Sequence, residues 1–181
     1  MMAGAQRIFL DMKFHDIPNS VALGVYEAAR HGVWMMTLHT SGGDAMMAAA
    51  IEAAADANPE IPPVLLGVTV LTSIDQDTLT KQLGVNRDLE EHAISLAKRA
   101  VACGLDGVVC SGHEVANIRK ALGPEPVLVT PGIRKSSSET QDQKRVVSGK
   151  DALNAGATYL VIGRALSDAE DPEAALVELG L

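Results

Sequence analysis

Short, almost continuously apolar runs alternate along the chain with longer stretches of helical periodicity. Such runs are typical of strands covered on both faces, and the stretches between them of helices that bury one side. Strands are predicted at Ile8–Lys13, Trp34–His39, Val64–Leu71, Gly107–Ser111, Val127–Thr130 and Tyr159–Gly163. Helices are predicted at Ser20–Arg30, Asp44–Ala57, Leu89–Ala102, His113–Leu122, Gly149–Ala155 and Pro172–Leu179. This repetition predicts an α/β fold with a parallel sheet.

Glycine marks the end of most predicted helices, and the next strand follows within a few residues. Glycine is favoured there because it adopts the left-handed conformation that closes a helix. The helix-ending glycines are Gly32, Gly104, Gly123 and Gly156. No linker or low-complexity tract interrupts the repeat, so residues 1–181 are predicted to form a single βα-repeat barrel domain.

Polar and glycine residues follow nearly every predicted strand, which bears on the type of parallel sheet. In a barrel the loops after all strands share one face, whereas a doubly wound sheet gathers its site at one switch point. We therefore expect the (β/α)8 TIM-barrel type, in an incomplete form, because six βα units are visible rather than eight.

Composition restricts the partners. Hydrophobic residues make up 47% of the chain, aromatic residues only 3%, and the net charge is −8, which disfavours nucleic-acid binding. No apolar run is long enough to span a bilayer, and the N-terminus lacks the features of a signal peptide. Cys103 and Cys110 are too few for a disulfide framework, so a cytoplasmic protein with reduced thiols is expected.

The end of the first predicted strand holds a compact charged cluster of Asp11, Lys13 and Asp16. Alternation along a strand turns Asp11 and Lys13 to the same side, and Asp16 follows where the chain turns. Charges on an apolar strand are costly unless they are paired or used. The cluster is either a catalytic group or a strand-end salt bridge with Asp16 as a turn residue.

The last two strands predict an anion site. Thr130–Arg134 and Val161–Arg164 each join a glycine to an arginine at a strand end. Late barrel loops often bind phosphate through backbone N–H groups, and arginine adds a forked cation. Taken singly, each is also compatible with an ordinary turn. The polar segment 135–143 is either a lid over the ligand or a mobile loop.

No cofactor or metal is expected. The five histidines lack metal-ligand spacing, and no glycine-rich nucleotide loop is present. Ser41 and Ser111 lack the histidine and acid partners of nucleophilic catalysis.

With these features the chain resembles the orotidine 5′-phosphate decarboxylase family. The segment Phe9–Ser20 is similar to the family's signature, which usually ends in threonine where Ser20 stands. The likeness continues through Val68–Ser73, Cys103–Ser111, Val129–Arg134, Asp142–Gln143 and Val161–Arg164. It implies a (β/α)8 barrel, a homodimer without cofactor or metal, and conversion of orotidine 5′-phosphate to UMP and carbon dioxide, the last step of de novo pyrimidine nucleotide synthesis.

The resemblance also implies residue roles. Lys13 would protonate the ring carbon that loses carbon dioxide, and Asp11 would lie against the substrate carboxylate. Asp16 would reach the neighbouring subunit's site, accompanied by Ile17 and Ser20. The remaining substrate contacts would be Thr72 with the pyrimidine, and Arg134, Gln143, Gly163 and Arg164 with the phosphate.

One element of the family pattern is not found. Its charged network is Lys-Asp-Lys-Asp, with the first lysine on an earlier strand, whereas this sequence leads from Met1–Arg7 directly into the family's third strand. A misassigned start or truncated chain, a rearranged or swapped dimer and a shortened relative are the alternatives. We expect impaired decarboxylation by this chain alone.

Two other functions remain open at this stage. The chain would be a non-catalytic remnant that binds UMP or another phosphate ligand if only the anion site works. It would be a magnesium-dependent sugar-phosphate decarboxylase or synthase relative if its Asp-x-Lys-x-x-Asp strand served that related chemistry.

Overall fold

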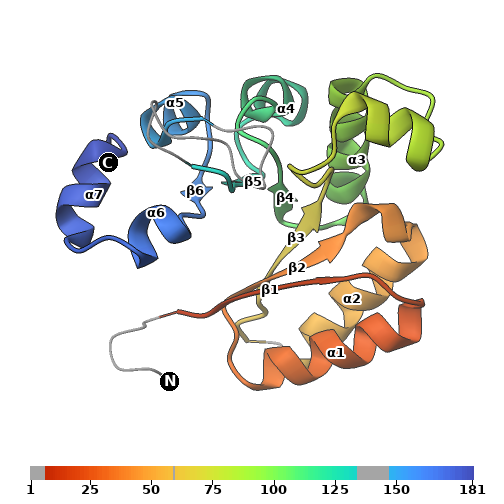
Figure 1. The fold of residues 1–181 in the computed structure, drawn as a ribbon. Coiled ribbons are helices and arrows are strands. Elements are labelled where there is room, and N and C mark those ends of the chain that lie inside the picture. The colour runs from red at the N-terminus through yellow and green to blue at the C-terminus, as the bar shows by residue number, and fades with distance from the viewer. Residues whose placement is uncertain (1–6, 59, 134–146) are drawn as a thin grey trace. The chain divides into compact units, whose positions relative to one another are not determined.

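The computed structural model describes residues 7–58, 60–133 and 147–181 (Figure 1). The strands are β1 (Phe9–Phe14), β2 (Met35–His39), β3 (Val64–Val68), β4 (Gly107–Val109), β5 (Val127–Thr130) and β6 (Tyr159–Leu160). The α-helices are α1 (Pro18–Arg30), α2 (Asp44–Ala57), α3 (Leu89–Cys103), α4 (Val115–Leu122), α5 (Gly149–Asn154), α6 (Arg164–Ser167) and α7 (Pro172–Glu178). A 3₁₀ helix, η1 (Thr40–Gly42), and a π-helix, η2 (Thr78–Gln82), complete the elements.

The strand order distinguishes the two parallel architectures that the sequence allowed. All six strands belong to one sheet in chain order, β1-β2-β3-β4-β5-β6, and the registered pairs β1–β2, β2–β3 and β5–β6 are parallel. A doubly wound sheet would reverse its direction of growth at a switch point, and this sheet does not. The incomplete TIM-barrel type predicted from the sequence is confirmed.

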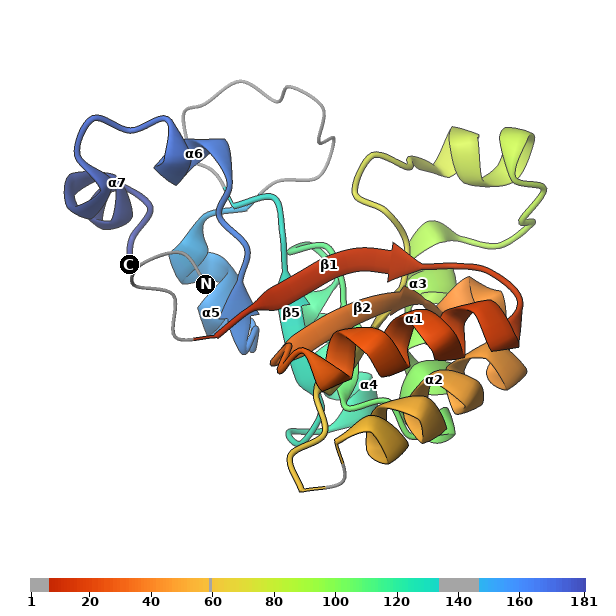
Figure 2. The same ribbon diagram turned by 90° about the horizontal axis from the view of Figure 1, so that it is seen from below.

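The chain divides into two compact units, the first of which comprises residues 1–69 and 96–108. In this unit α1 and α2 run side by side along β1–β3, and Figure 2 shows α1 passing in front of β2. Helix α1 buries Val21, Val25 and Ala29, which are four residues apart and therefore form one stripe. Strand β2 is buried from Met35 to Leu38. This packing holds β2 in place, and β1 pairs with it.

The predicted helix-ending glycines are confirmed by their backbone angles. Their φ values are +71° at Gly32, +102° at Gly104, +82° at Gly123 and +107° at Gly156. All four lie in the left-handed region, where glycine avoids the strain that a side chain would cause.

Strand β1 differs from the predicted strand covered on both faces. Its centre is exposed, its ends are half-buried, and the Met12 side chain is 60% exposed. In the described part of the chain β1 pairs with β2 on one side, so its side chains lack the double cover that β2 has.

The last strand and its surroundings also differ from the prediction. Strand β6 ends at Leu160 rather than Gly163, since the ladder with β5 stops after the Val161 N–H bonds to the Thr130 carbonyl. Residues predicted to finish this strand instead lead into α6, and η1 and η2 were not predicted either.

The second unit comprises residues 70–95 and 109–181, and Arg119 on α4 ties its loops together. The Arg119 guanidinium donates to the carbonyl oxygens of Gly123, Pro124 and Pro126 at 2.8 to 3.0 Å. It also donates to the Gly156 carbonyl at 2.8 Å through Nη2. Arginine therefore joins the end of α4 to the turn that precedes β6.

Replacing Arg119 with alanine is expected to lower the free energy of unfolding by about 2 kcal/mol, because several charge-assisted hydrogen bonds are lost together. Urea denaturation measures the change. Lys120→Ala is the matched control, since Lys120 is the exposed next residue of α4 and should shift stability by less than about 0.5 kcal/mol. Equal midpoints for the two variants would contradict the role of Arg119.

Candidate active site

A local irregularity shapes the end of β1. Leu10 pairs with Met36 and Phe14 with Leu38, so four steps on β1 oppose two steps on β2. Lys13 lies in this bulge with a φ of +51°, and among the described residues no other non-glycine residue has a positive φ. The left-handed backbone conformation costs a residue other than glycine roughly 1–2 kcal/mol, so neighbouring contacts must hold Lys13 in it.

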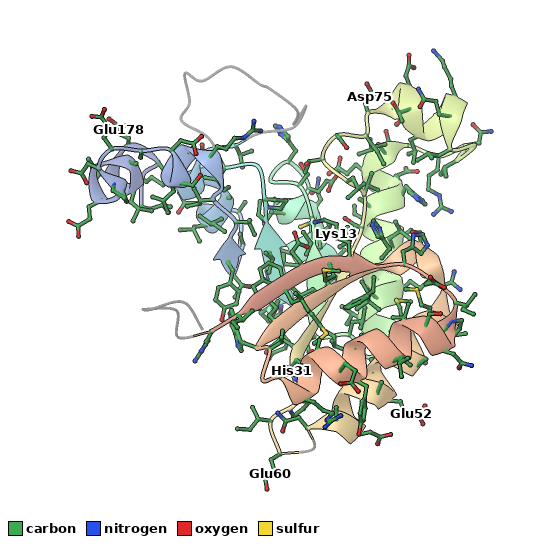
Figure 3. All side chains as sticks on the ribbon, turned by 60° about the horizontal axis from the view of Figure 1, so that its bottom comes forward. Lys13, His31, Glu52, Glu60, Asp75 and Glu178 are labelled. Carbon is green, nitrogen blue, oxygen red and sulfur yellow. The ribbon has the colours of Figure 1, made fainter. Side chains whose placement is uncertain are left out.

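The bulge brings Asp11 and Lys13 into contact. Lys13 Nζ lies 2.6 Å from Asp11 Oδ2, and both side chains remain partly exposed. Figure 3 shows Lys13 on the side of β1 that faces away from α1. The proximity expected from strand alternation is found, although a bulge rather than a regular strand produces it.

Thr37 on β2 is the third member of this cluster. It was not predicted from the sequence. Its side chain is fully buried, and its Oγ1 accepts from the Lys13 backbone N–H at 2.9 Å. The same hydroxyl donates to Asp11 Oδ1 at 2.8 Å. Thr37 is separated from Asp11 by more than twenty residues, so only the pairing of β1 with β2 could have revealed it.

Asp16 lies apart from the Asp11–Lys13 pair. Its carboxylate accepts from the Ile17 N–H at 2.6 Å, and no ion pair joins it to Lys13 within the described residues. Ile17 precedes the first turn of α1 and is 66% exposed, and Ser20 is also exposed. The predicted residues Asp16, Ile17 and Ser20 therefore form an accessible group at the start of α1.

Two imidazoles lie beside the charged cluster. The rings of His15 and His39 are 5.1 Å apart between centroids, and His39 ends β2. Burial lowers the pKa of His39 below its usual value of 6.5, and the nearby His15 and Lys13 lower it further against the opposing effect of Asp11. Neutral His39 thus adds no competing positive charge next to Lys13 at neutral pH.

The lowered pKa of His39 predicts how stability depends on pH. As the pH drops below about 6.5, the unfolded chain takes up a proton at this position more readily than the folded chain. The free energy of unfolding therefore decreases as the pH is lowered, until the pH is below the pKa of His39 in the folded protein. His92 has a pKa lowered by burial and contributes in the same direction. Urea denaturation from pH 7 to 5 should give a smaller loss for His39→Asn than for the unchanged protein. Exposed His31 supplies the control, and an equally reduced slope in His31→Asn would contradict this assignment.

The predicted substrate contacts after the later strands belong to the second unit. Thr72 lies in a turn and is half-buried. Gly163 and Arg164 are exposed, and Arg164 is the first residue of α6. Arg134, Gln143 and the proposed lid 135–143 lie outside the described residues. The structure thus brings together Asp11 and Lys13, while the roles of the other residues stay predictions.

Comparison with known proteins shows the family. The model of the Orotidine 5'-phosphate decarboxylase / HUMPS family matches residues 2–179. The chain belongs to this family. It is 49% identical over 172 residues to an orotidine 5'-phosphate decarboxylase of Pseudoalteromonas translucida, covering 95% of this chain and 73% of the relative. It is 50% identical over 174 residues to one of Neisseria meningitidis, covering 96% and 70%.

Solved structures support the decarboxylase family fold. The crystal structure of an orotidine 5'-phosphate decarboxylase from Lactobacillus acidophilus matches with a TM-score of 0.82 and 36% identity, covering 96% of this chain and 74% of that one. An uncharacterized conserved protein from Geobacillus kaustophilus matches with the same TM-score, identity and coverage.

The described residues hold no group of three or more histidine, cysteine, aspartate or glutamate side chains arranged to bind a metal ion. Nor does any described helix combine the length and hydropathy that crossing a membrane requires.

Proposed function

We propose that this chain decarboxylates orotidine 5′-phosphate to UMP without a cofactor or metal. The observation that supports this most strongly is the Asp11–Lys13 pair at the end of β1, with 2.6 Å between Nζ and Oδ2. It occurs in a chain about half identical to proteins named orotidine 5'-phosphate decarboxylase. Those names favour this activity over the sugar-phosphate alternative.

The charges of the pair suit the reaction. The substrate carboxylate would lie near Asp11, where like charges repel, and this repulsion is relieved as carbon dioxide leaves. The carbon–carbon bond breaks and its electron pair stays on the ring carbon. The Lys13 ammonium stabilises that developing charge and then donates a proton to the same carbon. The resulting neutral amine regains its proton from water.

The rest of the site follows from the same proposal. Thr72 would contact the pyrimidine, and Arg134, Gln143, Gly163 and Arg164 would hold the phosphate. Binding of the remote phosphate can supply energy for chemistry at the ring. The enzyme would be a cytoplasmic homodimer, and the two free cysteines, Cys103 and Cys110, agree with a reducing compartment.

A decarboxylation assay with orotidine 5′-phosphate, run beside UMP calorimetry, tests this function. Turnover that persists in EDTA supports the proposal, and its rate decides whether the chain is impaired as the sequence suggested. UMP binding without any turnover would instead support the non-catalytic remnant. Activity that requires added magnesium, on a sugar phosphate rather than the nucleotide, would favour the related family.

A further inference from the structure

The Thr37 hydroxyl closes a ring of hydrogen bonds around the end of β1. It accepts from the Lys13 N–H at 2.9 Å and donates to Asp11 Oδ1 at 2.8 Å. The other carboxylate oxygen of Asp11 accepts from Lys13 Nζ at 2.6 Å. The backbone N–H of Lys13 is thus bonded to Thr37 directly. Its ammonium is linked to Thr37 through the Asp11 carboxylate.

The direction of these bonds depends on the hydroxyl. A hydroxyl has one proton and can accept as well as donate. Because the Lys13 N–H uses an acceptor position, the Thr37 proton is free to point to Asp11. A side chain of the same shape without the hydroxyl would leave the Lys13 N–H without its acceptor and one Asp11 oxygen without its donor.

The fold alone does not explain this hydroxyl. The Thr37 side chain is itself fully buried, and valine has nearly the same shape, so packing alone does not require the hydroxyl. Two other buried threonines, Thr40 and Thr130, have hydroxyls without a hydrogen-bond partner among the described residues. The Thr37 hydroxyl, by contrast, has two bonds, both directed at the charged pair.

We infer that Thr37 is a positioning residue for decarboxylation, whose hydroxyl holds Lys13 in its left-handed conformation and fixes the orientation of the Asp11 carboxylate. This inference rests on the proposed function. Without the hydroxyl, the bulge can relax toward ordinary strand geometry and move the ammonium away from the reacting carbon. Asp11 can also rotate, since the last torsion of an aspartate side chain has a broad minimum.

Four proteins test the inference: the unchanged chain, Thr37→Val, Thr37→Ser and the control Thr40→Val. Thr37→Val should lower kcat about a hundredfold, because a displacement of about 1 Å has that effect on a reacting group. Its KM and its UMP dissociation constant should change less than about threefold, since the phosphate contacts are remote. Thr37→Ser restores the hydroxyl and should stay within about fivefold of the unchanged kcat, and Thr40→Val should match the unchanged protein.

Amide hydrogen exchange measured by NMR gives a readout that does not need turnover. The Lys13 amide should be protected in the unchanged protein, Thr37→Ser and Thr40→Val, and should exchange at least about tenfold faster in Thr37→Val. If Thr37→Val does not fold, Thr37→Cys replaces it, because a thiol is a weak donor and acceptor of similar size.

Three results would overturn the role of Thr37. They are an unchanged kcat in Thr37→Val, an equal loss in Thr37→Ser, or a parallel loss of UMP affinity. If the unchanged chain lacks turnover, the proposed function fails by itself. Amide exchange then tests separately whether the Thr37 hydroxyl holds the Lys13 backbone. An unprotected Lys13 amide in the unchanged protein would show that it does not.

Discussion

Alanine in place of Lys13 is expected to lower kcat for orotidine 5′-phosphate by about four orders of magnitude. The same ammonium would stabilise the carbanion and supply the proton, and each of these contributions alone is worth roughly a hundredfold or more. In the structure Lys13 Nζ lies 2.6 Å from Asp11 Oδ2. Lys13 has a positive φ angle, which no other described non-glycine residue has. Loss of the orotate ring absorbance, or release of labelled carbon dioxide, measures the change.

Two further variants make the test specific. Lys13→Arg keeps the positive charge but cannot give up its proton near neutral pH, so it should recover little of the lost kcat. Lys81→Ala removes an exposed lysine whose partner is Asp77 on the surface, and it should leave kcat unchanged. UMP binding should persist in Lys13→Ala, because other residues are proposed to hold the phosphate. Turnover in Lys13→Ala within tenfold of the unchanged chain would remove Lys13 from the mechanism.

The sequence predicted the alternation of elements and the charged strand end, for reasons that are local. Apolar runs, helix-ending glycines such as Gly32 and Gly104, and the spacing of Asp11 and Lys13 are properties of neighbouring residues. The order of the strands was predicted because a site spread over many strand ends favours a barrel.

The features that the sequence did not reveal depend on register. Thr37 meets Asp11 because the register that pairs Leu10 with Met36 sets the two following residues side by side, and apolar patterning does not encode which residues of two strands pair. Strand β6 ends at Leu160, where its ladder with β5 stops, and the length of a ladder is a property of the strand pair. The lowered pKa of His39 likewise arises from burial and from His15, neither of which follows from its place at a strand end.

A mixture of two inactive variants, Lys13→Ala and Asp16→Asn, is expected to regain activity. In the structure Asp16 forms no ion pair with Lys13 of its own chain among the described residues, and exposed Ile17 lies next to it. If Asp16 instead reaches the neighbouring subunit, a mixed dimer has one site with both Lys13 and Asp16 intact. The second site of that dimer lacks both.

Random exchange of equal amounts makes half of the dimers mixed, each with one working site, so the mixture should reach about a quarter of the unchanged activity. Asp16→Asn alone should lower kcat roughly a thousandfold, because a charge that would act next to the reacting groups of the neighbouring site is lost. The variants are refolded together and assayed at increasing protein concentration, with Asp16→Asn plus Asp11→Asn as a second complementing pair.

Asp11 and Lys13 are paired within one chain, so mixing Asp11→Asn with Lys13→Ala should restore no activity. No recovery in the first two mixtures would show that each site is built from a single chain, and recovery in the last would show that Asp11 and Lys13 of one chain do not serve the same site.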